Sequence, residues 1–242
     1  MAVFENEFLI KFREINKNYK LSNKGLLSFL EDVAGMHSDE VGYGLKTINK
    51  TNLTWLLLNW KVRVFSRPKY GDTVKVKTWA RDTVKIYTYR DFEVYNSNNE
   101  LIAIASSKWV LLDIRTMNLL KIPETLMDEY KPEMVKVFKD EPELNKITPP
   151  ASYNSCFSYV VQRKDIDFNR HMHNTTYLDL AYEVLPEDVY KNADISNVEI
   201  MYKKEAKLGD VLKCFYTNIE NSHYVVIKSE DEHTLHAVVK LD

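Results

Sequence analysis

Acidic, amide and imidazole side chains are concentrated in one short stretch of the sequence. Residues 165–177 read DIDFNRHMHNTTY and directly precede a segment with helical periodicity. A helix N-terminus presents unpaired backbone N–H groups and the positive end of its dipole, which can stabilise the oxyanion formed when a carbonyl is attacked. His171 can accept a proton near neutral pH, Asn169 can donate two hydrogen bonds, and Asp167 can orient a neighbour or act as a nucleophile. This stretch is therefore the candidate active site.

An internal repeat organises the chain. NWKVRVFSRPKYGDTVK at 59–75 aligns without gaps with NVEIMYKKEAKLGDVLK at 197–213, an offset of 209 − 71 = 138. Both copies contain Lys-x-Gly-Asp, in which glycine permits a turn before a new β-rich run. Upstream, 23–32 aligns with 174–183 at an offset of 174 − 23 = 151. Each copy is predicted to be one helix followed by several strands.

The periodicity of apolar residues places these elements. In the first copy, Ser22 or Asn23 is expected to cap a helix that ends at Gly42 or Gly44, and strands are expected at 54–64, 73–82, 87–96 and 100–113. In the second copy, Asn174 is expected to cap a helix through Leu185, with strands at 195–202, 211–220, 224–229 and 234–241. One long helix and an antiparallel sheet in each copy predict an α+β protein.

The predicted fold is two tandem hotdog repeats, each a long helix wrapped by an antiparallel sheet, which together form a double hotdog. Residues 1–123 are expected to form the N-terminal repeat and 152–242 the C-terminal repeat that carries the active site. Four prolines among charged residues favour an ordered but irregular linker at 124–151.

The candidate triad occurs in one copy only. At the offset of 151, Asp167, Asn169 and His171 align with an asparagine, an asparagine and a lysine at 16, 18 and 20. Such residues often only form loop hydrogen bonds and cap the next helix. A purely structural role would serve both copies, so the asymmetry favours one active site per chain, with the first copy retained for packing or ligand binding.

The stretch resembles a motif of the acyl-acyl carrier protein (acyl-ACP) thioesterases, D-x-N-x-H-x-N-N-x-x-Y, from which it departs where His173 replaces the first asparagine of the pair. The family's later Y-x-x-E segment corresponds to Tyr202–Glu205, so the resemblance implies a catalytic role for Glu205, where the first copy has Arg67. Ala206 stands where plant members often have cysteine, and no cysteine mechanism carries over. Locally, Glu205 also reads as a solvated charge in a lysine-rich run.

The first copy resembles the same family in three further segments: EDVAGMHSDEVG at 31–42, FSRPKYGDTVKVKTW at 65–79 and ASSKWVLLDIRTMNLLKIP at 105–123. The resemblance therefore covers almost the whole chain. Without a plastid-type extension, it points to a bacterial-style member.

The resemblance implies hydrolysis of fatty acyl-ACP to a free fatty acid and holo-ACP, which ends chain elongation and needs water but no cofactor. Glu205 and His171 are then expected to position and deprotonate water, Asn169 to orient the reacting groups, and Asp167 to hold the arrangement. In an alternative, Asp167 attacks first and forms an acyl-enzyme anhydride.

Three alternatives compete with hydrolysis. His171-x-His173 could hold a metal together with Asp167 or a histidine at 223, 233 or 236. A hotdog hydratase would act on acyl thioesters without an equivalent of Glu205 and would release no thiol. An inactive acyl-binding module would not need the cluster.

The carrier protein of this family is small and acidic, which predicts a basic patch that receives it. The candidates are Lys203, Lys204, Lys207, Arg63 and Arg67, which also read as ordinary solvated charges. A monomer or a homodimer is expected, and chain-length preference is not encoded in any pattern of the sequence.

Composition limits the other classes. With 242 residues, 45% hydrophobic and 28% charged, the chain reads as a soluble globular protein, and no apolar run approaches the roughly 20 residues of a membrane span. A net charge of -2 offers no basic surplus for nucleic acid. The N-terminus lacks the pattern of a signal peptide, so a cytoplasmic location is expected. Cys156 and Cys214 have neither zinc nor disulfide spacing, and both are expected to be buried.

Overall fold

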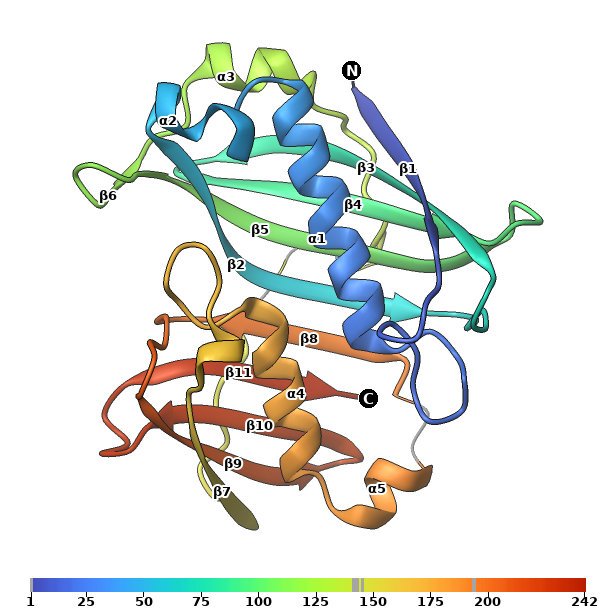
Figure 1. The fold of residues 1–242 in the computed structure, drawn as a ribbon, viewed down its shortest axis with the longest axis vertical. Helices are drawn as coiled ribbons and strands as arrows, with labels where there is room; N and C mark the ends of the chain where they lie inside the picture. The colour runs from blue at the N-terminus through green and yellow to red at the C-terminus, as the bar shows by residue number, and fades with distance from the viewer. Residues whose placement is uncertain (1, 141–143, 145, 193–194) are drawn as a thin grey trace. The chain divides into compact units, whose positions relative to one another are not determined.

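The computed structural model describes residues 2–140, 144, 146–192 and 195–242, which form two compact units, Met1–Leu144 and Asn145–Asp242. In each unit, a long helix packs on an antiparallel sheet (Figure 1). The α+β class predicted from the sequence is confirmed, and the two predicted helices and eight predicted strands are all present. The strand ends differ from the predicted ones by no more than two residues.

The first unit is built on helix α1 (Asn23–Glu40) and a sheet with the strand order β1-β3-β4-β5-β2. Its strands are β1 (Val3–Leu9), β2 (Leu53–Val64), β3 (Thr73–Val84), β4 (Tyr87–Tyr95), β5 (Leu101–Asp113) and β6 (Asn118–Leu120), the last paired with β5. The 3-10 helix η1 (Leu45–Thr47), helix α2 (Ile48–Thr51) and helix α3 (Glu124–Tyr130) complete it.

The second unit repeats this plan on helix α4 (Asn174–Val184) and a sheet with the strand order β8-β11-β10-β9-β7. Its strands are β7 (Ser155–Val160), β8 (Asn197–Tyr202), β9 (Val211–Ile219), β10 (Ser222–Ser229) and β11 (Leu235–Leu241). The 3-10 helix η2 (Arg163–Asp165) precedes α4, and helix α5 (Glu187–Asn192) follows it.

The two long helices start differently. Ser22 caps α1, because its Oγ accepts a hydrogen bond from the backbone N–H of Gly25 at 2.9 Å. The predicted cap of α4 was wrong: Asn174 is the first helical residue, and the N-cap is His173, whose side chain makes no capping bond. Once Asn174 has helical backbone angles, its side chain is no longer placed to bond the first-turn N–H groups as an N-cap does.

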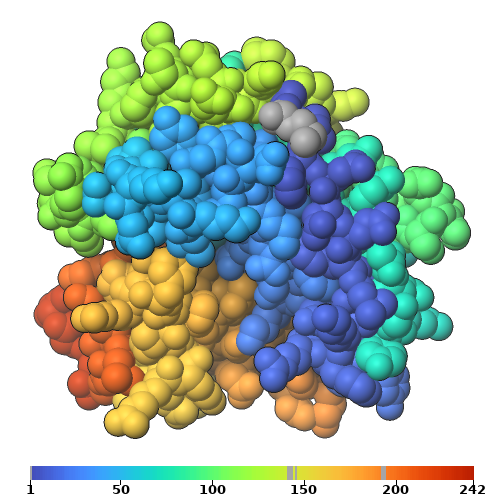
Figure 2. Space-filling view, turned by 45° about the horizontal axis from the view of Figure 1, so that its top comes forward, coloured from blue at the N-terminus to red at the C-terminus, as the bar shows by residue number. Residues whose placement is uncertain are grey.

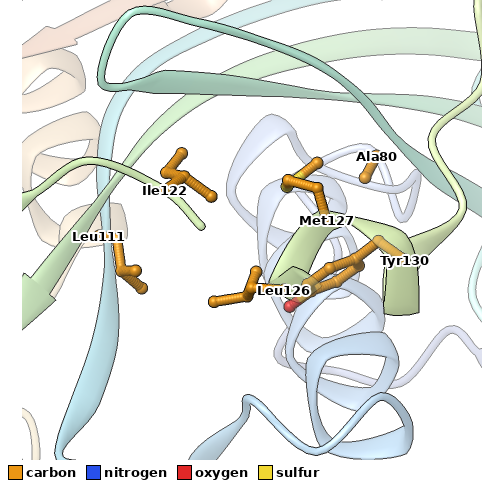
Figure 3. Close-up of a cluster of buried hydrophobic side chains, with 6 residues drawn as sticks. All are labelled: Ala80, Leu111, Ile122, Leu126, Met127 and Tyr130. Carbon is orange, nitrogen blue, oxygen red and sulfur yellow. The ribbon is translucent and has the colours of Figure 1, made fainter. Parts of the chain in front are cut away.

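The interior of the first unit includes residues from the segment predicted as a linker. Leu126, Met127 and Tyr130 of α3 pack with Ala80, Leu111 and Ile122 (Figure 3). The prediction of irregular structure was therefore wrong for 124–130, since the apolar face of a two-turn helix was hidden among charged residues. Ile147 in the remainder of that segment packs in the second unit with Met201, Val226 and Val238.

Three strands were not predicted: the outer strands β1 and β7, and the short strand β6. In β1, exposed and half-buried residues alternate, and the half-buried rings of Phe4 and Phe8 stack on His37 and Phe29 of α1. The polar run Glu5–Glu7 conceals this alternation in the sequence. Side chains of this N-terminal segment, drawn in blue, lie at the surface in Figure 2. Nearly all residues of strand β7 are exposed, so its sequence shows no alternation of apolar and polar residues that would predict a strand.

A buried carboxyl group lies on β4 of the first unit. Asp91 is fully buried and accepts hydrogen bonds from Ser106 Oγ at 2.6 Å, from Arg81 Nη1 at 3.3 Å and from the backbone N–H of Val137 at 3.0 Å. Burial raises the pKa of Asp91 above its usual range, although these three donors oppose the shift. The carboxyl group holds the segment around Val137 against the sheet.

Candidate active site

The stretch singled out in the sequence forms a tight loop before α4. Asp167 Oδ1 accepts hydrogen bonds from the backbone N–H groups of Asn169 at 2.8 Å and His171 at 3.1 Å. The N–H of Asp167 donates to the carbonyl of His171 at 2.8 Å, and Arg170 has a left-handed backbone with φ of 65°. The Asp167 carboxylate therefore shapes the loop that presents His171.

The loop brings His171 against Glu205. His171 Nε2 lies 3.4 Å from Glu205 Oε2, and the two side chains are 21% and 46% exposed. A backbone hydrogen bond of 2.8 Å from Met172 N to Ala206 O joins the loop to the turn after β8. Two residues that are 34 positions apart (205 − 171 = 34) thus form an acid–imidazole pair that water can reach.

Asn169 and His173 are placed differently. Both are exposed, and neither side chain has a hydrogen bond to the His171–Glu205 pair among the described contacts. The predicted orienting role of Asn169 remains a prediction. The structure brings together three of the four predicted residues through the loop, namely Asp167, His171 and Glu205.

The equivalent loop of the first unit has the same backbone with different side chains. Asn16 Oδ1 accepts from the N–H groups of Asn18 at 2.9 Å and Lys20 at 3.2 Å, and Tyr19 has φ of 59°. At the position of Glu205, Arg67 turns to the start of α1 and donates to Leu21 O at 2.9 Å and to Asn23 Oδ1 at 2.8 Å. Two cations, Lys20 and Arg67, stand where the second unit has imidazole and carboxylate.

Among the residues that the structure describes, no three histidine, cysteine or acidic side chains lie close enough together to hold a metal ion. His223 Nδ1 lies 3.0 Å from the hydroxyl of Tyr216, and His236 Nδ1 donates to Lys204 O at 2.8 Å. The structure therefore gives His171 a carboxylate partner in place of the metal considered from the sequence.

The predicted basic residues fall into two groups. Lys203, Lys204 and Lys207 are exposed on the turn that carries Glu205. Arg63 and Arg67 belong to the first unit, where Arg63 lies over the ring of Phe138 at 5.5 Å. Only the three lysines border the candidate site within one unit.

The two cysteines differ in exposure. Cys214 is buried as predicted, and burial raises its pKa to about 12. The prediction for Cys156 was wrong, since it is exposed on β7. Neither cysteine has a described contact with His171 or Glu205.

Each of the two tandem units is a long helix on an antiparallel sheet, and the second has an acid–imidazole pair where the first has Lys20 and Arg67. These features define a hotdog protein with a candidate hydrolytic site in its second unit. Family models for the acyl-ACP thioesterase N-terminal domain and C-terminal domain match residues 1–130 and 150–240. The chain belongs to the acyl-ACP thioesterase family.

Curated relatives agree with this assignment. The chain is 25% identical over 241 residues to oleoyl-acyl carrier protein thioesterase 2, chloroplastic, of Arabidopsis thaliana. This match covers 93% of the chain and 65% of the relative, so the chain spans less than two thirds of that protein's length.

Solved structures show the same fold. The 12:0-ACP thioesterase from Umbellularia californica superposes with a TM-score of 0.86 and 22% identity, covering 100% of this chain and 97% of that one. An acyl-ACP thioesterase from Bacteroides thetaiotaomicron gives 0.84 and 22%, covering 99% and 97%. The predicted tandem hotdog fold is thereby confirmed. Among the described helices, none is long and apolar enough to span a membrane.

Proposed function

We propose that the protein is an acyl-ACP thioesterase that hydrolyses fatty acyl-ACP to a free fatty acid and holo-ACP, and so ends chain elongation. The observation that carries this proposal is the pair His171 Nε2–Glu205 Oε2 at 3.4 Å in a chain of this family. The first unit, which has Lys20 and Arg67 at these positions, serves as an internal comparison without the pair.

The pair supplies general-base chemistry. Water held by His171 and Glu205 loses a proton to His171 as its oxygen attacks the thioester carbonyl carbon. The tetrahedral intermediate collapses with cleavage of the C–S bond, and the proton returns to the leaving sulfur, which gives the carboxylic acid and the thiol. A positioned general base contributes about 100- to 10,000-fold to the rate. No cofactor takes part in this balance.

Asp167 acts by holding the loop. Two backbone N–H groups already bond its Oδ1, so this oxygen is engaged in closing the loop. In the anhydride mechanism, water that attacks the aspartyl carbonyl carbon of the anhydride during single-turnover hydrolysis in ¹⁸O-labelled water would leave label in the Asp167 side chain. We expect mass analysis of that peptide to find none, and label there would establish Asp167 as the nucleophile.

We further propose that Lys203, Lys204 and Lys207 receive the acidic carrier protein beside the site. Reversing all three to glutamate should lower kcat/KM on acyl-ACP by at least tenfold, an effect of about 1.4 kcal/mol, and should leave hydrolysis of a small acyl thioester unchanged. Reversing Lys85, Lys131 and Lys139 of the first unit changes the net charge equally and serves as the matched control. Equal losses in both triple variants would exclude a local patch.

Thiol release from a panel of acyl carrier protein thioesters of varied chain length tests the function. Release above the buffer rate is expected and gives the chain preference. Release from no chain length would contradict the proposal and favour a hydratase or an acyl-binding module, which product analysis and acyl-ligand binding would then separate. The cytoplasmic location and the monomeric or homodimeric state stay predictions, for cell fractionation and light scattering to test.

A further inference from the structure

We infer that His236 and Tyr177 are positioning residues that fix Glu205 beside His171. The inference rests on the proposed function and adds two residues to it. Both contact the backbone on either side of Glu205: His236 Nδ1 donates to Lys204 O at 2.8 Å, and the Tyr177 hydroxyl accepts from Ala206 N at 3.1 Å.

A third bond completes the hold on this turn. The carbonyl of Ala206 accepts from Met172 N at 2.8 Å, in the loop that carries His171. The residue before Glu205 and the residue after it are thus both tied to other elements. Glu205 keeps only its own side-chain torsions, and its carboxylate is presented to His171 by a fixed backbone.

The two anchors are themselves rigid. His236 is 5% exposed, Tyr177 is 3% exposed, and Ala206 between them and the site is fully buried. Tyr177 packs edge-on against Tyr202 with ring centroids 5.6 Å apart, and the Tyr202 hydroxyl donates to Asn174 O at 3.1 Å. Burial raises the pKa of Tyr177, and the charge of Glu205 raises it further, so its hydroxyl stays neutral at working pH.

The first unit builds the same turn without these anchors. The N–H groups of residues 65–66 donate to Ile102 O at 2.8 and 3.2 Å, as those of 203–204 donate to His236 O at 2.8 and 3.4 Å. Ile102 therefore occupies the place of His236. The turn's backbone forms equally well with an apolar side chain there.

The same holds for the second anchor. At the offset of 151, Tyr177 aligns with Leu26, and at the offset of 138, Ala206 aligns with Pro68, which has no N–H to donate. The bond from Leu21 N to Pro68 O at 2.9 Å repeats the one from Met172 to Ala206. His236 and Tyr177 thus occur in the second unit, whose turn carries Glu205, and are replaced by Ile102 and Leu26 in the first. Because the turn also forms in the first unit, these two polar residues are not needed for the turn to fold.

The His236 anchor is tested by two substitutions that differ in one donor. In His236→Asn, the amide nitrogen can occupy nearly the position of Nδ1 and donate to Lys204 O. His236→Leu removes the donor and leaves an apolar side chain, like that of Ile102 in the first unit. Since a displacement of about 1 Å at a catalytic group costs about 100-fold in rate, we expect kcat on acyl-ACP to fall about 10- to 100-fold in His236→Leu. His236→Asn should stay within about threefold of the wild type, and KM should be unchanged in both.

The Tyr177 anchor is tested by Tyr177→Phe, which keeps the ring and removes the acceptor of Ala206 N–H. We expect kcat to fall about tenfold at unchanged KM, together with faster hydrogen exchange of the Ala206 amide. Val238→Ala, in the buried cluster of the second unit, is the matched control: it lowers Tm while kcat of the folded protein stays constant.

Two results would overturn the inference while wild-type hydrolysis is intact: equal kcat in His236→Leu and His236→Asn, or a Tyr177→Phe protein with wild-type kcat. A wild-type protein without thiol release on any chain length would instead refute the proposed function. Hydrogen exchange at Ala206 reports the Tyr177 anchor independently in that case, and unchanged exchange in Tyr177→Phe would overturn the anchor as well.

Discussion

The loop before α1 and the loop before α4 share one backbone and differ in their side chains. Each is closed by a side-chain oxygen, of Asn16 or Asp167, that accepts from two N–H groups, and each has one left-handed residue at the same position. What changes is the pair displayed: Lys20 with Arg67 in the first unit, His171 with Glu205 in the second. Both units have the same backbone at this place, and two residue differences, His171 for Lys20 and Glu205 for Arg67, give the second unit its acid–imidazole pair.

The comparison also divides the predicted catalytic residues by role. The hydrogen bonds of Asp167 are matched by Asn16, so this residue has a loop-forming role that both units need. His171 and Glu205 have no such counterpart. The asymmetry between the two copies thus applies to the pair and only in part to Asp167.

The largest effect is expected from transplanting the first unit's residues. The double variant His171→Lys with Glu205→Arg should lose at least 1,000-fold in kcat, within the range of about 100 to 10,000 for a general base. Because the first unit carries lysine on the equivalent loop and arginine on the equivalent turn, circular dichroism and Tm should stay close to the wild type. If the double variant still hydrolyses acyl-ACP, the His171–Glu205 pair is not required for the reaction.

A smaller effect is expected at Asp167. Asp167→Asn introduces the residue that the first unit has at this position, Asn16, and keeps an acceptor for both N–H groups. A neutral acceptor is weaker than a charged one, so kcat should fall, but by no more than about tenfold. Asp167→Ala removes the acceptor and should lose more activity and some Tm. If the asparagine variant is as inactive as the alanine variant, the carboxylate does more than shape the loop.

The next prediction concerns the buried carboxyl group of Asp91 in the first unit, in contrast to the partly exposed pair of the second. Burial raises the folded-state pKa of Asp91, so the folded chain binds this proton more tightly than the unfolded chain does. Stability linked to the neutral carboxyl is present at low pH and is lost as pH rises through the raised pKa. Relative to Asp91→Asn, the wild type should therefore lose a few degrees of Tm as the pH rises above about 4, the usual pKa of an aspartate. A constant or opposite difference, measured by calorimetry, would contradict this sign.

The smallest effect is expected from thiol reagents. Cys156 is exposed and Cys214 is buried with its pKa raised to about 12, so a disulfide reagent at pH 8 should label one thiol in the native chain and two after denaturation. Labelling should leave kcat unchanged, because the residue that follows Glu205 is Ala206 and not a cysteine. Cys156→Ser is the control and should abolish native labelling. Inactivation that follows labelling would point to a cysteine role.

The repeat made much of this structure predictable. Alternation and helical spacing are local signals, and two copies of the Lys-x-Gly-Asp turn fixed where strands begin; both glycines have left-handed angles, with φ of 86° at Gly71 and 87° at Gly209. Strand β1 and helix α3 escaped prediction because their burial is set by neighbours distant in sequence. Strand β7, which is nearly all exposed, and the three-residue strand β6 carry too little periodic signal to be predicted. The same holds for the anchors: Tyr177 stood in a recognised motif, but its contact with Ala206 spans 29 positions (206 − 177 = 29), and His236 was noticed only as a possible ligand.

The catalytic role of the His171–Glu205 pair is tested by hydrolysis by wild type, His171→Ala and Lys20→Ala, measured as thiol release from the same acyl-ACP panel. Lys20 occupies the position of His171 in the first unit, so its variant controls for damage to the loop. We expect His171→Ala to lose at least 100-fold in kcat with its fold intact, as for removal of a general base, and Lys20→Ala to keep the wild-type rate. Equal rates in all three proteins, or equal losses in both variants, would contradict this catalytic role.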